Sequence, residues 1–161
     1  MRVVADTGPL QYLILLDRID LLSVLFTGVT VPTEVRAELL HVAAPDAVRR
    51  WAANPPAWLV IAPAPTPDDP RLARLGAGEA AAITLARSLQ ADLVLMDDRT
   101  GVAAARARGL DVIGTVGVLD RAATRRLIDI ADAVARLRAT NFRIRPALLG
   151  ALLADHRGDA P

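Results

Sequence analysis

The sequence contains neither cysteine nor lysine, and each absence excludes a class of chemistry. All 19 basic residues of the 161-residue chain are arginines. Without cysteine there is no disulfide, no thiol nucleophile and no cysteine-ligated zinc. Without lysine there is no Schiff base, no P-loop and no receiver-type phosphorylation site. The two histidines, His41 and His156, are far apart and lack metal-ligand spacing, so neither is expected to act in a site.

Aromatic residues and long apolar runs are also scarce. Aromatics make up 3% of the chain and hydrophobic residues 53%, which predicts a core of aliphatic side chains. The most apolar stretch, Leu13–Phe26, is interrupted by Asp17, Arg18 and Asp20, so it cannot span a bilayer. No targeting segment is evident, and we expect a cytoplasmic protein. The length predicts one domain, residues 1–161, with C-terminal helices at about 128–155 packed on it.

Short apolar runs alternate with helical patterns along the chain. Five runs lack polar alternation and predict buried strands: Val3–Ala5, Val29–Val31, Trp58–Ile61, Leu93–Met96 and Val112–Ile113. Segments with helical spacing separate most of them, and a proline-rich connector at residues 62–70 follows the third. This order predicts an α/β fold of three layers, α/β/α, with a central parallel five-stranded sheet.

Acidic residues stand where these elements meet. Asp6 follows the first predicted strand, and Asp97 with Asp98 follows the fourth. Glu38 lies about two turns into the helix after the second strand, and Glu79 begins the helix before the fourth. Ligands of parallel sheets gather at the carboxyl edge, and clustered carboxylates favour Mg²⁺ or Mn²⁺. The alternative is that such acids only cap helices or interact with helix dipoles.

Charge is distributed unevenly along the chain. Residues 1–98 hold eight arginines and twelve acids, whereas residues 99–145 hold ten arginines and four acids. An acidic centre beside a basic flank suits a metal ion and a phosphate backbone. Arginines on solvated helix faces would give the same asymmetry, so the pattern alone leaves both explanations open.

Five motifs in order resemble the PIN domain, a metal-dependent nuclease fold, and more closely the short prokaryotic proteins allied to the VapC toxins. The motifs are Val4–Leu10 (VADTGPL), Val31–Leu39 (VPTEVRAEL), Gly78–Ile83 (GEAAAI), Leu95–Arg99 (LMDDR) and Gly109–Thr115 (GLDVIGT). The resemblance extends from Met1 to about Leu153. It departs from the toxins at Leu95, where they often have Thr or Ser, and at Val102, where this branch often has Arg.

The resemblance implies a fold, a site and an activity. It places the family's acidic quartet, as catalytic and metal-binding residues, on Asp6, Glu38, Glu79 and Asp97. It also implies that the first and fourth strands are neighbours at the centre of a PIN-like sheet. The implied activity is that of a Mg²⁺- or Mn²⁺-dependent endoribonuclease, which hydrolyses phosphodiester bonds as the toxin of a toxin–antitoxin pair. Secondary candidates are Thr7, Asp98, Arg99 and Thr115, although such threonines more often cap helices.

The expected partners are an RNA substrate, an antitoxin protein and a second copy of the chain. The leucine-rich segments 13–25 and 148–153 are expected to offer apolar surface to an antitoxin, unless they pack internally or in a homodimer. Two other functions remain open. One is a catalytically inactive PIN-like module that binds nucleic acid or protein. The other is a haloacid-type phosphatase, which would need an Asp two residues after Asp6, where Gly8 stands.

Overall fold

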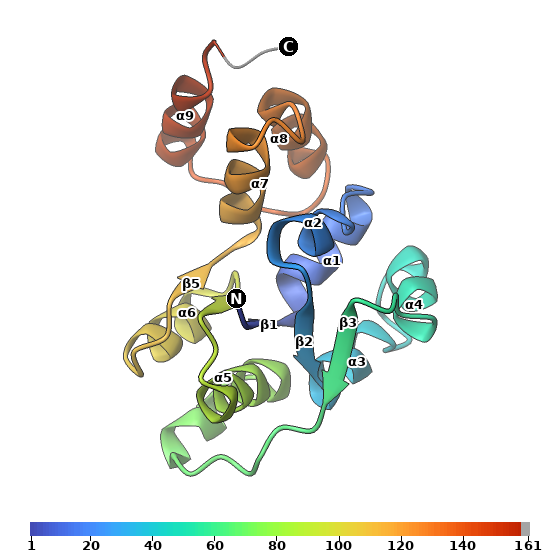
Figure 1. Cartoon of the computed structure of the whole chain (residues 1–161), viewed down its shortest axis with the longest axis vertical. Helices are drawn as coiled ribbons and strands as arrows, with labels where there is room; N and C mark the ends of the chain where they lie inside the picture. Colours follow the sequence, from blue (N-terminus) through green and yellow to red (C-terminus); the bar gives the residue numbers. More distant parts are fainter. Residues whose placement is uncertain (159–161) are drawn as a thin grey trace.

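The five predicted strands form one parallel sheet. The computed structural model describes residues 1–158, so the last three residues of the predicted domain 1–161 lie outside it. The strands are β1 (Val3–Ala5), β2 (Val29–Pro32), β3 (Leu59–Ala62), β4 (Leu93–Leu95) and β5 (Val112–Ile113). They pair in the order β3-β2-β1-β4-β5, and every pairing is parallel. The predicted α/β fold with a central five-stranded sheet is therefore confirmed (Figure 1).

Helices fill the connections between the strands. They are α1 (Thr7–Leu15), α2 (Leu21–Phe26), α3 (Thr33–Leu39), α4 (Asp46–Ala53), the 3₁₀ helix η1 (Pro70–Arg74), α5 (Ala77–Leu89), α6 (Arg99–Arg106), α7 (Thr115–Thr124), α8 (Ile130–Arg138) and α9 (Pro146–Asp155). Helix α1 begins at Thr7, directly after Asp6. One boundary differs from the sequence prediction, because helix α5 begins two residues before Glu79, which places that acid within the first turn.

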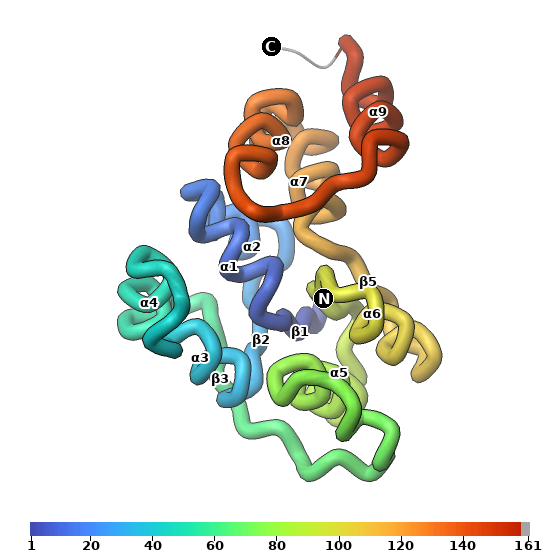
Figure 2. Tube along the Cα trace, turned by 180° about the vertical axis from the view of Figure 1, so that it is seen from behind, coloured from blue at the N-terminus to red at the C-terminus, as the bar shows by residue number. Residues whose placement is uncertain are grey.

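The central strands are buried on both faces, as their unbroken apolar sequence predicts. Leu93 and Leu95 of β4 belong to the hydrophobic cluster that contains α1, α2, α7 and α8. Val94 and Met96 belong to a second cluster, built mainly with α5 and α6. Because alternate residues of a strand point to opposite faces, the sheet separates two helical layers, which Figures 1 and 2 show from opposite sides.

Strands β1 and β4 form the centre of the sheet, and the chain changes direction between them. Ala5 is in register with Leu95, and the Asp6 amide donates a hydrogen bond to the Leu95 carbonyl at 2.9 Å. From β1 the chain continues to β2 on one side, and from β4 to β5 on the other. Such a switch point opens a crevice at the carboxyl ends of the two strands. Asp6 and Asp97 both follow these ends.

The C-terminal helices α8 and α9 share the first hydrophobic cluster. Ile130, Val134 and Leu137 of α8 and Leu152 of α9 are buried in it. The connector between the two helices returns to α1. The Tyr12 hydroxyl donates to Asn141 Oδ1 at 2.8 Å, and the Tyr12 ring packs edge-on against Phe142, with 4.9 Å between centroids. Asn141 and Phe142 therefore lie against α1, and Figure 2 shows the connector crossing α1 before it leads to α9.

The leucine-rich segment 13–25 is largely buried, so it does not present the apolar surface that the sequence led us to expect for an antitoxin. Leu13, Leu16, Leu22 and Leu25 are all buried, because α1 and α2 turn these side chains onto the sheet and onto α7. At the other end Leu152 is buried and Leu148 is exposed. Within residues 1–158, none of the helices combines the length and apolar character needed to cross a membrane.

Candidate metal centre

Asp6 is a buried carboxylate at the end of the central strand. It occupies the N-cap position of α1 but makes no side-chain capping hydrogen bond, so capping does not explain it. The residue is 6% exposed, and its Oδ1 atom is buried with no hydrogen-bond donor among residues 1–158. Burial raises the pKa of Asp6 to about 7. The Thr7 amide offsets part of this rise, and nearby acids, Glu79 first, add to it.

Asp97 lies opposite, after β4, and is held rigidly by the start of α7. Its Oδ1 accepts a hydrogen bond from the Thr115 amide at 2.7 Å, and its Oδ2 accepts one from the Thr115 hydroxyl at 2.6 Å. The close approach depends on Gly114, where a Cβ atom would overlap the Asp97 carboxylate. Burial raises the pKa of Asp97, although both Thr115 hydrogen bonds lower it. Both carboxylate oxygens are thus fixed in position.

Glu38 reaches the same place from α3 and is fixed in a similar way. Its Oε2 accepts a hydrogen bond from the Thr7 hydroxyl, and its Oε1 accepts one from the Gly78 amide at 2.9 Å. Gly78 lies in the first turn of α5, where amide groups have no partner within the helix. The glutamate therefore links the N-terminal turns of α1 and α5.

Glu79 extends from the first turn of α5 toward the start of α6. Burial raises the pKa of Glu79, and the negative charges of Asp98 and Glu38 raise it further. Asp98 itself caps α6, because its Oδ2 accepts a hydrogen bond from the Gly101 amide at 3.0 Å. The acids repel one another at neutral pH, which a divalent cation between them would relieve.

A cavity of about 400 Å³ brings these side chains together. Its lining residues are Asp6, Thr7, Gly8, Tyr12, Glu38, Glu79, Asp97, Asp98, Phe142 and Arg143. All four predicted quartet residues contribute, together with Thr7 and Asp98. Thr115 acts behind the cavity through Asp97, and Arg99 lines the neighbouring cavity instead. The sequence prediction omitted Tyr12, Phe142 and Arg143. A signal existed only for Tyr12, one helical turn after Gly8 and so on the same helix face.

The donor set suits a hard divalent cation. Mg²⁺ and Mn²⁺ prefer carboxylate oxygens and retain several waters, and the buried Oδ1 of Asp6 has no other partner. In the described part of the chain, no three Asp, Glu or His side chains are arranged so that they could hold an ion as they stand. The hydrogen bonds of Glu38 to Thr7 and of Asp97 to Thr115 direct these carboxylates to their own partners. The donor atoms therefore fit a divalent ion in their chemistry, but their present arrangement does not by itself form a coordination sphere.

A family described as a PIN domain (DUF3368) matches residues 2–157, which is nearly the whole chain. A comparison with curated proteins found no match. The matched region contains all five acids of the cavity and the helices α8 and α9 of the C-terminal part.

Proposed function

Because the chain belongs to the PIN-domain family, whose members are generally nucleases, we propose that it is a Mg²⁺- or Mn²⁺-dependent endoribonuclease. We assign it to the VapC-toxin-like branch and propose Asp6, Glu38, Glu79 and Asp97 as its catalytic and metal-binding residues. The observation that carries the proposal is the buried, unpartnered Oδ1 of Asp6 in a cavity with four further acids. A carboxylate in that position costs stability unless a cation compensates its charge.

The chain's own residues would divide the work of phosphodiester hydrolysis. When bound, a divalent ion lowers the pKa of a water molecule and stabilises negative charge on the phosphate. Asp6 offers the open oxygen for that ion. Thr7 and Thr115 keep Glu38 and Asp97 in place through their hydrogen bonds.

The direct test is incubation of purified protein with single-stranded RNA or DNA in the presence of Mg²⁺, Mn²⁺ or a chelator. We expect RNA cleavage with either ion and none with the chelator. Cleavage that survives chelation would contradict the proposed metal dependence. Binding of nucleic acid without any cleavage would instead favour the catalytically inactive module.

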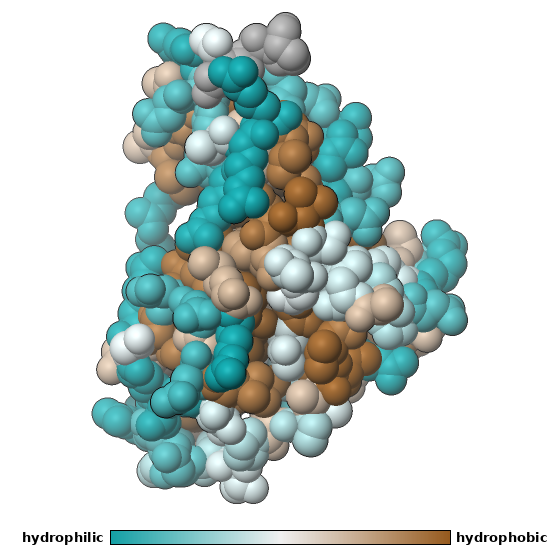
Figure 3. Space-filling model, viewed as in Figure 1, coloured by the Kyte–Doolittle hydropathy of each residue, from teal (hydrophilic) through white to brown (hydrophobic). Residues whose placement is uncertain are grey.

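We also propose an antitoxin partner and a homodimer. An arginine of an antitoxin could bond a cavity carboxylate through two parallel hydrogen bonds. For a homodimer, the face in Figure 3 presents apolar side chains over α2 and beside β3. Val24 of α2 and Val60 of β3 are each more than half exposed. Co-expression with neighbouring genes and measurement of the mass in solution test these two partners separately.

Substitution of Gly78 by Ala separates activity from stability. A Cβ atom at residue 78 would lie 2.6 Å from Glu38 Oε2, so the glutamate must move. Alanine is the better helix former by up to about 1 kcal/mol, so the fold should persist. We expect RNA cleavage to fall by at least about 10-fold, the range found when residues that orient metal ligands are changed.

The matched control is Gly150→Ala in α9, where an added Cβ atom would meet nothing within 4 Å. This variant should gain helix stability and retain wild-type cleavage. Equal activity of the Gly78→Ala and Gly150→Ala proteins would show that the position of Glu38 is unimportant for the reaction.

A further inference from the structure

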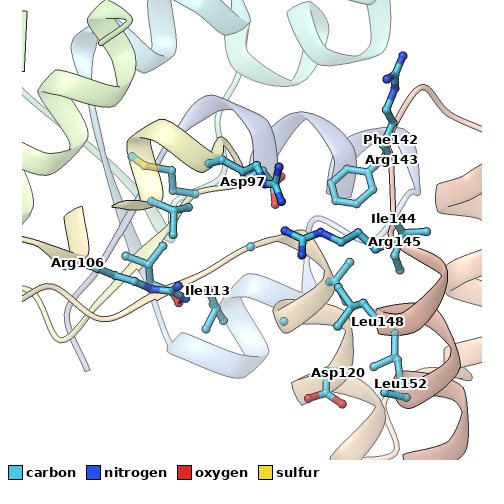
Figure 4. Close-up of a pocket in the computed structure, with 18 of the residues that line it drawn as sticks. Asp97, Arg106, Ile113, Asp120, Phe142, Arg143, Ile144, Arg145, Leu148 and Leu152 are labelled. Carbon is cyan, nitrogen blue, oxygen red and sulfur yellow. Dashed lines mark hydrogen bonds between the residues drawn. The ribbon is translucent and has the colours of Figure 1, made fainter. Parts of the chain in front are cut away.

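A second and larger cavity adjoins the acidic one. It measures about 980 Å³ and lies between α6, β5 and α7 on one side and the connector with α9 on the other. Asp97, Phe142 and Arg143 line both cavities. Figure 3 shows the molecule hollowed between its upper and lower parts in this region, and Figure 4 shows the lining side chains. We call this second cavity the groove.

Four arginines line the groove: Arg99, Arg106, Arg143 and Arg145. None of them forms an ion pair with any residue in the range 1–158, whereas arginines elsewhere, such as Arg108 with Asp69, do. Figure 4 shows the Arg145 side chain extending into the groove on the side of Asp97. The positive charge of the groove is therefore available to a ligand.

Two of these arginines stand at helix starts, where the helix dipole disfavours positive charge. Arg99 is the first residue of α6, and Arg145 is the N-cap of α9. The Asp98 carboxylate caps α6 and offsets the positive charge there, whereas α9 has no acidic residue at its N-cap or in its first turn. The Arg145 guanidinium and the positive end of the α9 dipole thus act together on the groove. This arrangement weakens α9 slightly and strengthens the attraction for an anion.

Apolar side chains accompany the arginines. Val102, Ile113, Val116 and Leu148 line the groove, and Leu148 is 49% exposed. The groove also contains Asp120, which pairs with His156 at 2.7 Å, and Asp155 at the end of α9. A ligand that combines repeated negative charge with flat apolar faces would match this surface. Single-stranded nucleic acid has both, because its phosphates repeat and its unpaired bases are exposed.

The connector that carries two of the arginines is fixed to the acidic site. Tyr12 holds Asn141 by a hydrogen bond and Phe142 by its ring, and Tyr12 itself lines the acidic cavity. The backbone of the connector is consequently anchored beside the acidic cavity, while the exposed side chains of Arg143 and Arg145 extend from it in different directions (Figure 4). A strand bound along the groove would extend directly to the carboxylates of the acidic cavity.

We propose that the groove binds single-stranded RNA on one side of the bond to be cut, with Arg143 and Arg145 on its phosphates and the apolar wall against its bases. This inference rests on the proposed ribonuclease function and names the element that presents its substrate. A duplex keeps its bases paired and would gain only the arginine contacts.

The test compares two double variants that each lose two positive charges. One is Arg143→Ala with Arg145→Ala in the groove. The other is Arg50→Ala with Arg74→Ala, two exposed arginines that form no ion pair in the part of the chain that the structure describes. Binding of labelled single-stranded RNA is measured by fluorescence anisotropy in chelator, at several salt concentrations, so that no cleavage occurs. Cleavage with Mg²⁺ is then measured separately.

We expect the groove variant to weaken RNA binding at least about 10-fold at low salt and to reduce the salt slope by about 1.4, since each single-strand phosphate contact contributes about 0.7. Its KM should rise with kcat nearly unchanged, and the control variant should match the wild type. If both variants have the same Kd and the same salt slope, the proposal that the groove binds RNA is wrong, while the ribonuclease proposal remains intact.

Other outcomes separate the two proposals further. The wild-type protein could bind RNA without cleaving it, and the groove variant could lose this binding. That result would support RNA binding by the groove and reject the catalytic function. Equally tight, equally arginine-dependent binding of duplex RNA would overturn the assignment to single strands. Preferential binding of a polyglutamate peptide over RNA would overturn it in favour of an acidic protein partner.

Discussion

Replacing Asp6 or Asp97 by Asn is expected to lower metal-dependent RNA cleavage by at least about 100-fold while the fold persists. Changes to residues that merely orient metal ligands cost about 10- to 100-fold, and these two carboxylates are proposed as ligands themselves. Both belong to the cavity at the carboxyl ends of β1 and β4. The hydrophobic clusters on either side of the sheet do not depend on their charge.

The matched control is Asp111→Asn. Asp111 is exposed and precedes β5, at the opposite edge of the same sheet. Cleavage rates of the three variants are compared at saturating Mg²⁺, together with their circular dichroism spectra. Full activity in a folded Asp6→Asn or Asp97→Asn protein would remove the acidic cavity as the active site.

The same Asp6→Asn variant is expected to be more stable than the wild type at pH 8 without metal. Burial raises the pKa of Asp6 from 3.8 to about 7, so the native state retains a proton that the unfolded state releases. Stability therefore falls as the pH rises from about 4 to about 7. With about 1.4 kcal/mol for each pKa unit, the stabilisation on removal of the charge reaches up to about 4 kcal/mol.

Thermal unfolding between pH 4 and pH 8 in chelator tests this expectation. The difference in Tm between Asp6→Asn and the wild type should be small at pH 4 and largest at pH 8. Millimolar Mg²⁺ should raise the Tm of the wild type, since a ligand of the native state stabilises it by mass action, and it should have little effect on the variant. A Tm difference that is independent of pH would show that ionisation of the buried Asp6 carboxylate does not destabilise the protein.

The strands and the strand-end acids could be predicted from local sequence. A run such as Val3–Ala5 has no polar face, so it indicates a strand that is covered on both sides, and the acid after it marks a carboxyl end. The pairing of β1 with β4 is a different matter. No local pattern specifies strand order, and the expectation that these strands are neighbours came from the resemblance to a known family.

The partners of the acids could not be predicted because they are distant in sequence. Thr7 and Thr115 each begin a helix, as a capping residue would, yet their hydroxyls donate to carboxylates 31 and 18 residues away. The ring contact between Tyr12 and Phe142 likewise joins opposite ends of the chain. Hydrophobic period and capping preference describe neighbours along the helix, so they contain no information about such contacts.

The pairing of β1 with β4 also determines when the acidic cavity can exist. At the amino end of the same pair, the Arg2 amide donates to Asp92, 90 residues along the chain. Closing so long a loop costs entropy before any contact compensates it, and such pairings slow folding. A nascent chain on the ribosome cannot juxtapose Asp6 and Asp97 until most of the protein has been synthesised. The proposed metal site is therefore incomplete throughout the greater part of translation.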